Sequence, residues 1–590
     1  MNPLSSYNRA SLLKKLSSEE YDLLIIGGGI TGGGIALDAA SRGMKTVLIE
    51  KQDFAAGTSS RSTKLIHGGL RYLKNGEIGL VKKVGRERAI VFRNAHHLVV
   101  PEKFLLPLVK HGPFGKFTAL LGLWVYDLLA GVIKEERRKI FSKKETLEIE
   151  PLLRSDDLKG GCIYYEYRTN DARLTIEIIK TAVKYGADCI NYVKAENFLY
   201  KDNRVTGVEC RDMLAGQNVH FNAGNLNWKN TFTITAKQTV NATGPWIDNI
   251  RIVDDSLEGK RLHLTKGVHL VVPGKQLPIK QSVYFNAPNN RNVFAIPHGI
   301  VTYIGTTDTD YSGNLEDPPV SRDDADYLIN SINLIFPGVK LSISDVISSW
   351  AGIRPLIQQE GKLPSEISRK DEIFISQSGL ISIAGGKLTG YRKMAKRVVD
   401  MVNKNLHATF GFPKVKCKTK NIVICGGEID VVSNYILEVS NKIYAYGLGK
   451  YDAEYLVRAY GKQTDILLEK FYEFITAKTG AVLPDGLASR ETASVSNELM
   501  RDTVLNRATQ LKIQLARAEL WFAVNYEATF NLKDFFTRRT GKLYFEIQSI
   551  EMLLIPLLQD MKDYLDLTDD ECKVQKAEME KALVECRTFI

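Results

Sequence analysis

Three glycines with the spacing of a nucleotide-binding turn lie near the start of the chain. Gly27, Gly29 and Gly32 form a GxGxxG motif that directly follows an apolar run and opens a helical pattern. The first glycine permits a tight turn, the second lets the backbone approach a pyrophosphate, and the third lets helix and strand pack closely. Glu50 ends the next apolar run, where a carboxylate can bind a ribose 2′-hydroxyl. The motif predicts dinucleotide binding and favours FAD or NAD over NADP.

A hydroxyl- and glycine-rich stretch over residues 56–73 distinguishes between these two cofactors. A nicotinamide enzyme usually has another helix and strand at this point, whereas a long loop of this kind suits a flavin laid across the sheet edge. An ordinary surface loop is the alternative, but eighteen residues of this composition are uncommon in one. The residues of this stretch that we expect to contact the cofactor are Thr58, Ser59, Ser60, Ser62, Lys64, Leu65, His67 and Gly68.

Two further turns of small residues, 241–246 and 385–389, follow apolar strands and point to the same sheet edge. A helix that starts at about Lys387 can direct its positive end at the negative charge that develops on a reduced flavin. We expect these turns, together with the start of the first helix, to supply further cofactor contacts. These are Ile30, Thr31, Ala242, Thr243, Gly244, Gly386, Lys387, Leu388 and Thr389.

The elements that would position these residues alternate between strands and helices over residues 20–410. Strands at 21–26 and 45–50 flank a helix at 29–42, which is the βαβ unit of a parallel sheet. Residues 265–350 instead contain short strands between turns, which is typical of an antiparallel sheet, interrupted by a helix at 322–336. After about residue 410 the pattern is helical, and apolar residues recur at helical spacing from Val504 to Phe522. We place a domain boundary at 407–420.

The composition excludes several classes of protein. The 590 residues are 44% hydrophobic and 25% charged, which is ordinary for a globular chain and unlike a disordered, collagenous or coiled-coil one. The net charge of +11 suits an anionic partner, which can be a phosphorylated substrate, a membrane surface or nucleic acid, or it can serve solubility alone. Seven cysteines without a CxxC pair argue against a disulfide framework and indicate a reducing compartment.

Neither a signal peptide nor a membrane span is predicted. The first twenty residues lack an apolar core of signal-peptide length. The most apolar stretch, residues 118–132, is too short to span a bilayer and carries Asp127. It can form a buried helix or lie flat on a membrane surface, with Trp124 and Tyr126 at the interface. His96 and His97 are adjacent and have no acidic neighbour in the sequence, so we predict no metal site.

Six motifs together resemble one known family, the FAD-dependent glycerol-3-phosphate dehydrogenases, and occur in the same order. They are residues 27–32, 64–73, 241–246, 305–308, 352–356 and 385–389. The related α-glycerophosphate oxidases share the pattern. The resemblance spans about residues 20–400, and the tail resembles that family's C-terminal domain more loosely, through Arg538-Arg539-Thr540. It implies an α/β fold: a glutathione-reductase-type FAD-binding domain with an antiparallel β-sheet substrate cap and a C-terminal all-helical domain.

The resemblance also implies a division of the chain and a reaction. Residues 19–410 would form the FAD-dependent oxidoreductase region and 415–590 the helical domain. The FAD-binding parts would be about 19–90, 155–262 and 352–405, and the substrate cap about 91–154 and 263–351. FAD would be bound non-covalently. By hydride transfer from C2 to flavin N5, sn-glycerol 3-phosphate would become dihydroxyacetone phosphate.

Candidate roles follow from the resemblance and from the chemistry of this substrate. In the family, positions matching Arg71, Tyr72 and Arg354 line the substrate pocket, and the planar fork of arginine suits a phosphate. His67 is our candidate for the base that takes the C2 hydroxyl proton; a structural histidine beside the flavin is the alternative. Lys387 and Lys266 are further candidates for the anionic pocket. We expect the other strand-borne histidines, His263, His269 and His298, to be structural.

The sequence is compatible with two electron acceptors, a membrane quinone and O₂. A dehydrogenase would pass electrons to a membrane quinone, and the positive charge would hold a cytoplasmic protein peripherally on the anionic surface of the cytoplasmic membrane. An oxidase would pass them to O₂ and release H₂O₂. Some family oxidases carry a long insertion between the motifs of Arg354 and Lys387, but only 32 residues separate them here, which favours the dehydrogenase. A homodimer is an open alternative. A flavin-containing nucleic-acid-binding protein is disfavoured because the chain has no stripe of alternating aromatic and basic residues.

Overall fold

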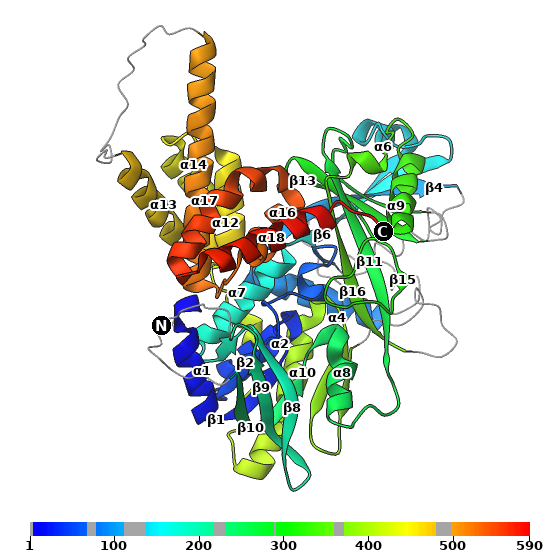
Figure 1. Ribbon diagram of the computed structural model, residues 1–590. Helices are drawn as coiled ribbons and strands as arrows, with labels where there is room; N and C mark the ends of the chain where they lie inside the picture. The colour runs from blue at the N-terminus through cyan, green and yellow to red at the C-terminus, as the bar shows by residue number, and fades with distance from the viewer. Residues whose placement is uncertain are drawn as a thin grey trace.

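The computed structural model describes residues 4–67, 78–110, 137–215, 230–287, 291–358, 371–479 and 497–590. These residues form two β-sheets and a group of C-terminal helices (Figure 1). In that view the first sheet lies at the bottom, the second at the upper right, and the helices at the upper left.

The first sheet carries the predicted βαβ unit at its centre. Its order is β17-β18-β10-β1-β2-β7, with β9 and β8 continuing from β10. The strands are β1 (Glu20–Ile26), β2 (Thr46–Ile49), β7 (Asp188–Ile190), β8 (Val193–Lys201), β9 (Arg204–Asp212), β10 (Thr231–Asn241), β17 (Asp371–Ile375) and β18 (Ile381–Gly385). Because β1, β2, β10 and β18 run parallel, their carboxyl ends meet at one edge. The turns at 27, 50, 242 and 385 therefore meet there.

Helix α2 (Ile30–Ser41) packs between α7 (Asp171–Lys184) and α10 (Tyr391–Phe410). Its small residues allow this close approach. A Cβ atom at Gly33 would lie 3.0 Å from Ile179, and one at Gly34 would lie 2.8 Å from the ring of Tyr391. The glycine-rich sequence of this helix thus serves packing beyond the nucleotide-binding motif itself.

The second sheet is mostly antiparallel, as expected for the cap, and its order is β15-β11-β14-β13-β12-β4-β6-β3, with β16 on β11 and β5 on β6. Its strands are β3 (Leu65–Ile66), β4 (Val100–Val109), β5 (Lys139–Ser142), β6 (Leu158–Arg168), β11 (Leu262–Pro273), β12 (Ser282–Asn286), β13 (Asn292–His298), β14 (Val301–Gly305), β15 (Thr309–Asp310) and β16 (Ser348–Ile357). Helix α9 (Arg322–Ile335) packs on this sheet and shares its apolar core. Helix α4 (Ile78–Asn94) and the short helices α6 (Lys143–Ile149) and α8 (Ile247–Val253) complete this part of the chain.

Some strands of the cap sheet lie wholly or partly outside the expected cap ranges. β6 falls within the expected FAD-binding part 155–262, and β16 runs across the boundary at 352. β6 belongs to the cap because it pairs along its length with β4, and β16 because it pairs with β11 over ten residues. The chain therefore passes between FAD region and cap inside continuous elements as well as in loops.

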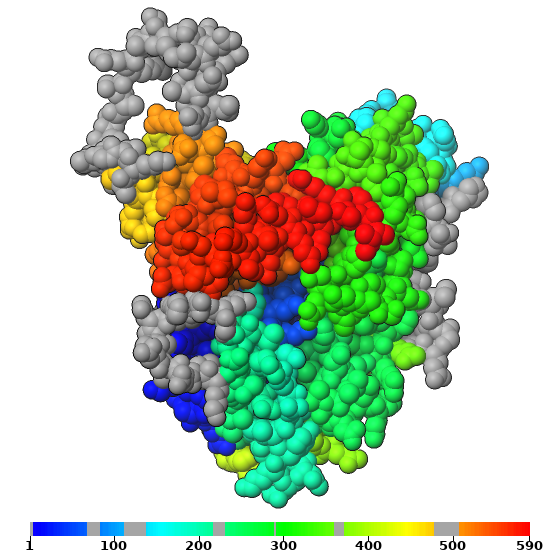
Figure 2. Space-filling model, viewed as in Figure 1, coloured from blue at the N-terminus to red at the C-terminus, as the bar shows by residue number. Residues whose placement is uncertain are grey.

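The C-terminal helices are α11 (Val432–Tyr444), α12 (Lys450–Tyr460), α13 (Thr464–Thr479), α14 (Asn497–Tyr526), α15 (Leu532–Asp534), α16 (Lys542–Phe545), α17 (Ile547–Leu565) and α18 (Asp569–Glu585), with a π-helical turn at Phe535–Arg539. The predicted helical region is confirmed. Apolar residues of α14 and α17 join the same core as Leu23 and Ile178 of the FAD region. The chain's last residues lie across the cap (red on green in Figure 2), where Ile590 N–H donates to Val320 O at 3.1 Å.

None of the described helices combines the length and apolar character that crossing a lipid bilayer requires. The apolar stretch 118–132, with Trp124, Tyr126 and Asp127, lies outside the described residues.

Candidate active site

A cavity of about 720 Å³ opens where the carboxyl ends of the parallel strands meet the cap sheet. This volume is in the range of sites for large organic ligands. Most of the predicted site residues line it. They are Gly27, Gly29, Ile30, Thr31, Glu50, Thr58, Ser59, Ser62, Leu65, His67, Ala242, Thr243, Gly244, Arg354, Gly386, Lys387, Leu388 and Thr389.

Gly27 and Gly32 show why the first motif needs glycine. Gly27 has φ +115°, and a Cβ there would lie 2.6 Å from Ala242 O. A Cβ at Gly32 would lie 1.8 Å from Gly27 O. Gly32 does not line the cavity, because it is the packing glycine of the motif. The turn thus keeps backbone, free of side chains, at the cavity wall.

Glu50 is held rigidly at the end of β2. Its Oε2 accepts from Gly28 N–H at 2.7 Å and its Oε1 from Gln52 N–H at 2.9 Å. Burial raises the pKa of Glu50, against the effect of these two amides. Ser59 Oγ accepts from Ile30 N–H at 2.9 Å at the start of α2. The hydroxyl-rich loop is therefore attached to the nucleotide-binding turn, as a shared cofactor site requires.

Three of the predicted site residues support the cavity from behind. Lys64 is buried, and its ammonium binds Asp171 Oδ1 at 2.6 Å and Ser60 O at 3.1 Å. Ser60 is buried as well. Lys266 pairs with Asp324 of α9 at 2.9 Å. None of the three lines the cavity, and each lysine is instead paired with a buried carboxylate. Gly68, Arg71 and Tyr72 lie outside the described residues.

Arg354 lies on β16, and its guanidinium packs on Gly267 of the neighbouring strand β11. Its Nη1 donates to Thr307 O at 2.9 Å and to Asp308 Oδ1 at 3.0 Å, and its Nη2 donates to Thr306 Oγ1 at 2.8 Å. A Cβ at Gly267, on the facing strand β11, would lie 2.2 Å from Arg354 Nη2. The glycine lets the guanidinium lie flat on the sheet at the cavity wall, where a planar fork can bind a phosphate.

Two imidazoles reach the cavity. His67 follows β3, and its backbone is tied to Thr389: His67 N–H donates to Thr389 Oγ1 at 3.1 Å, and that hydroxyl donates to His67 O at 3.2 Å. His269, which we expected to be structural, also lines the cavity. It stacks on Trp350 at 4.8 Å, and its Nε2 lies 3.0 Å from Thr63 Oγ1. Burial, with the nearby charge of Arg354, holds the pKa of His269 well below its ordinary value, so this imidazole is neutral at pH 7.

The sequence carried a signal for His269 in the glycines of the cap strands. A Cβ at Gly305, on the neighbouring strand β14, would lie 2.1 Å from His269 Cδ2. A glycine inside a strand marks close approach of another group. Other lining residues that were not singled out are Lys51, Thr63, Val193, Asn197 and Thr306.

The turn at 385–389 differs from the expected helix start. Gly385 and Gly386 have φ of +72° and +84°, and Lys387 is extended. A single 3₁₀ turn (Leu388–Gly390) follows, and α10 begins only at Tyr391. The expected start of this helix at Lys387 is therefore wrong by four residues, because the two left-handed glycines direct the chain along the cavity first.

These residues fit FAD. The glycine turn offers backbone to a pyrophosphate, Glu50 stands where a ribose hydroxyl would lie, and the same cavity extends to the cap. Among the described residues, no group of three or more His, Cys, Asp or Glu side chains is placed to hold a metal ion.

Comparisons with known proteins agree with this geometry. The family model of FAD dependent oxidoreductases matches residues 22–392, and that of the C-terminal domain of alpha-glycerophosphate oxidase matches residues 417–572. An aerobic glycerol-3-phosphate dehydrogenase of Bacillus subtilis is 49% identical over 546 residues, which is 92% of this chain and 91% of that protein. One from Staphylococcus aureus is 44% identical over 589 residues, covering 99% and 98% of the two chains.

A solved structure is similar over nearly its whole length. The glycerol-3-phosphate dehydrogenase from Bacillus halodurans, in complex with FAD, has a TM-score of 0.78 and 38% sequence identity. The match covers 99% of this chain and 98% of that one. The expected fold class and the expected family are both confirmed.

Proposed function

This chain belongs to the family of FAD-dependent oxidoreductases, and on that premise we propose that it oxidises sn-glycerol 3-phosphate to dihydroxyacetone phosphate. One observation carries the proposal: a dinucleotide-binding turn and a cap-borne arginine line the same cavity. The relatives named as glycerol-3-phosphate dehydrogenases cover more than nine-tenths of the chain and supply the substrate class.

The residues of the cavity wall then have separate roles in binding and orienting the substrate. FAD, when bound, supplies the two-electron oxidant that accepts the hydride from C2. Arg354 binds the phosphate dianion, and its contacts with Thr306 and Asp308 hold its fork in one orientation. Lys387, just before the 3₁₀ turn Leu388–Gly390, adds a further cation at the cavity wall. Cations placed in this way orient a three-carbon phosphoester, and orientation of this kind contributes several kcal/mol to a rate.

His67 is our proposed base for the C2 hydroxyl proton, and His269 is the second candidate because it lines the same cavity. The two histidines differ in the contacts that hold them. His67 is held at the cavity wall through its backbone by Thr389, and its ring lies edge-on to that of Phe294. The ring of His269 is held by Trp350 and Thr63, and its lowered pKa makes it a poor proton acceptor. His269 is better suited to donate or accept one fixed hydrogen bond.

We propose a quinone as electron acceptor and a peripheral site on an anionic membrane, with O₂ as the alternative acceptor. The relatives are named dehydrogenases and not oxidases, which favours an acceptor other than O₂. The family model of the C-terminal region is named for an oxidase and keeps O₂ open as the acceptor. The net charge of +11 supports the membrane contact. We retain a homodimer as a proposal and expect no nucleic-acid partner.

The purified protein tests the proposal directly. It should be yellow, and anaerobic glycerol 3-phosphate should bleach the flavin bands, whereas unphosphorylated glycerol should act far more weakly. A protein that binds no FAD, or whose bands do not respond to the phosphoester, would contradict the proposed function.

The acceptor is tested separately, by reoxidation of the reduced enzyme in air and with a soluble quinone analogue. Fast reoxidation by the quinone and slow reoxidation in air are expected. Rapid H₂O₂ release in air would identify an oxidase instead. Salt-sensitive sedimentation with anionic but not neutral vesicles is the expected result for the membrane contact.

A further inference from the structure

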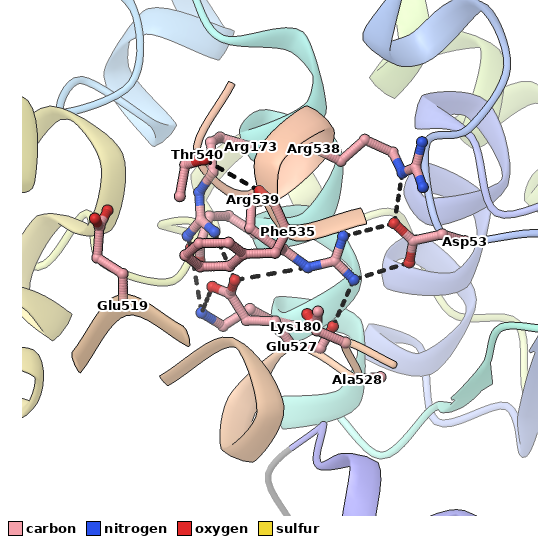
Figure 3. Close-up of polar contacts among 12 residues, drawn as sticks. Asp53, Arg173, Lys180, Glu519, Glu527, Ala528, Phe535, Arg538, Arg539 and Thr540 are labelled. Carbon is pink, nitrogen blue, oxygen red and sulfur yellow. Dashed lines mark hydrogen bonds and ion pairs between the residues drawn. The ribbon is translucent and has the colours of Figure 1, made fainter. Parts of the chain in front are cut away.

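The loop after β2 contributes to the cavity and also contacts the C-terminal helices. Glu50, Lys51 and Gly57 line the cavity, but Asp53 between them is fully buried and does not. Arg539 donates two parallel bonds to it, Nη1 to Oδ2 at 2.6 Å and Nη2 to Oδ1 at 2.8 Å. Arg538 Nε donates to Oδ2 at 2.5 Å (Figure 3). A carboxylate of the FAD-binding loop is thus held in a fork supplied almost 500 residues later in the chain.

A second wall segment is tied to the same place. Val193 and the four residues after it line the cavity. Just before them, Tyr192 donates its hydroxyl to Asp534 Oδ2 at 2.5 Å, and Asn191 Nδ2 donates to Asp53 Oδ1 at 2.9 Å. The two segments also bond each other, because Val193 N–H donates to Glu50 O at 2.8 Å. The loop that contains Asp53 and the segment that begins at Asn191 are therefore both bonded, directly or through Asp534, to the turn that carries Arg538 and Arg539.

Arg539 links Asp53 to a larger buried network that includes α7. Its Nη2 donates to Glu527 O at 2.8 Å. The Glu527 carboxylate accepts from Arg173 at 2.7 Å and from Lys180 at 3.1 Å (Figure 3). The network contains four cations and four carboxylates: Arg173, Lys180, Arg538, Arg539, Asp53, Glu177, Glu527 and Asp534.

The balance of charge explains how the network is tolerated in the interior. All eight side chains are buried, and burial alone would raise the pKa of Asp53; the guanidiniums of Arg539 and Arg538 instead lower it to about 2. Asp53 is therefore ionised at every physiological pH. Apolar residues of similar volume would avoid the cost of desolvating these charges, so the contribution of the network lies in the fixed geometry that it imposes.

We propose that Arg538 and Arg539 are positioning residues for the adenosine end of FAD. Among the described residues, none of the C-terminal helices lines the cavity, so these arginines act only through others. They bind Asp53 directly and bind Tyr192 through Asp534. These contacts fix the loop after β2 and the segment that follows Tyr192, which together form the cavity wall around Glu50. The inference rests on the proposed function only in that FAD occupies this cavity. It assigns to the C-terminal helical domain the task of keeping the cofactor site closed around the nucleotide.

The release of FAD from the holoenzyme tests this inference. Flavin fluorescence is followed at a temperature at which circular dichroism shows each variant to be folded. Asp53→Asn keeps the shape but loses the charge, and we expect FAD to leave at least about tenfold faster. Arg539→Lys keeps the charge and loses the fork, so a smaller increase, about threefold or more, is expected. Tyr192→Phe removes one hydroxyl from the second wall and should accelerate release to a similar degree.

Asp560→Asn is the control, because it breaks a two-bond Asp–Arg pair that joins two of the same C-terminal helices and is partly exposed. Asp560 of α17 accepts two bonds from Arg517 of α14, both at 2.7 Å, and neither residue lines the cavity. This variant should melt at a lower temperature but release FAD within about twofold of the parental rate. A second readout is the rise in melting temperature on adding FAD to apoprotein, which should shrink in Asp53→Asn and persist in Asp560→Asn.

Parental FAD release in a folded Asp53→Asn would overturn the inference. Equally fast FAD release from Asp560→Asn would also overturn it, since both ion pairs would then affect FAD release only through the overall stability of the fold. If Asp53→Asn does not fold, Tyr192→Phe decides in the same way: faster release supports the inference and parental release overturns it. Failure of the proposed function would look different, because the parental protein itself would then hold no FAD or would not respond to glycerol 3-phosphate.

Discussion

Replacing Gly267 by alanine displaces Arg354 without removing any functional group. A Cβ atom at position 267 would lie 2.2 Å from Arg354 Nη2, 2.6 Å from its Cζ and 2.7 Å from Thr306 Oγ1. Ordinary van der Waals contact begins at about 3.4 Å, so the guanidinium must retreat by roughly 1.2 Å. The atoms that move are the end of a flexible side chain, so the fold should tolerate the change.

The expected effect is on the use of substrate. A misplacement of about 1 Å in a positioning group can cost about a hundredfold in rate. We therefore expect kcat/KM for glycerol 3-phosphate to fall by roughly tenfold to hundredfold, which is about 1.4 to 2.7 kcal/mol. Most of the loss should appear in KM, because the phosphate is bound both before and during the chemical step. The FAD content should not change, since the displaced Arg354 guanidinium is assigned to the phosphate and not to FAD.

Steady-state kinetics with an artificial acceptor, together with the flavin absorbance per chain, measure these quantities. Gly338→Ala is the matched control, because its Cβ would meet nothing within 4 Å. The control should keep parental kinetics. A folded Gly267→Ala with parental KM would refute the assignment, because the phosphate could not then depend on where the Arg354 guanidinium lies.

Three further outcomes are expected. Arg354→Ala should raise KM by roughly tenfold to hundredfold with FAD retained, since a charged hydrogen-bonding partner is lost; a parental KM would place the phosphate elsewhere. In rapid-mixing reduction experiments, His67→Gln should slow flavin reduction at saturating substrate by about a hundredfold or more, whereas His269→Gln should slow it less. The reverse order would make His269 the base. Against the effect of burial, neighbouring cations lower the pKa of Asp53 and of Glu527 to about 2 each, from 3.8 and 4.5. A lowered carboxyl pKa stabilises the fold above the unfolded pKa, so on the order of 2 kcal/mol per group should be lost as the pH falls from about 4.5 towards 2. Melting temperatures measured across that range test this, and a flat profile would contradict it.

The cofactor end of the site was predictable because its signals are local. Each of Gly27, Glu50, Ala242 and Gly386 follows directly on a strand of the parallel sheet, and parallel strands bring their carboxyl ends to one edge whatever the rest of the chain does. The glycine spacing then specifies which backbone can approach a pyrophosphate. Residue type and position along the chain were sufficient for this part, and the comparisons confirm the cofactor that it implies.

The cap end was less predictable because residue type alone does not show whether a charge is already neutralised. Lys64 and Lys266 have the residue type of anion-binding groups, but each meets a buried carboxylate distant in the sequence, Asp171 and Asp324. His269 follows the alternation of an ordinary strand, yet a glycine on the neighbouring strand leaves it space at the cavity wall.

The sequence by itself determined the βαβ unit, the turns at the sheet edge and the class of cofactor, because these depend on residues within a few positions of one another. Only the tertiary structure decided which cations face the cavity and that Arg539 holds Asp53 across 486 residues. The physical reason is that a charge in the interior is defined by its partner, and partners are chosen by how the elements pack rather than by where they lie along the chain.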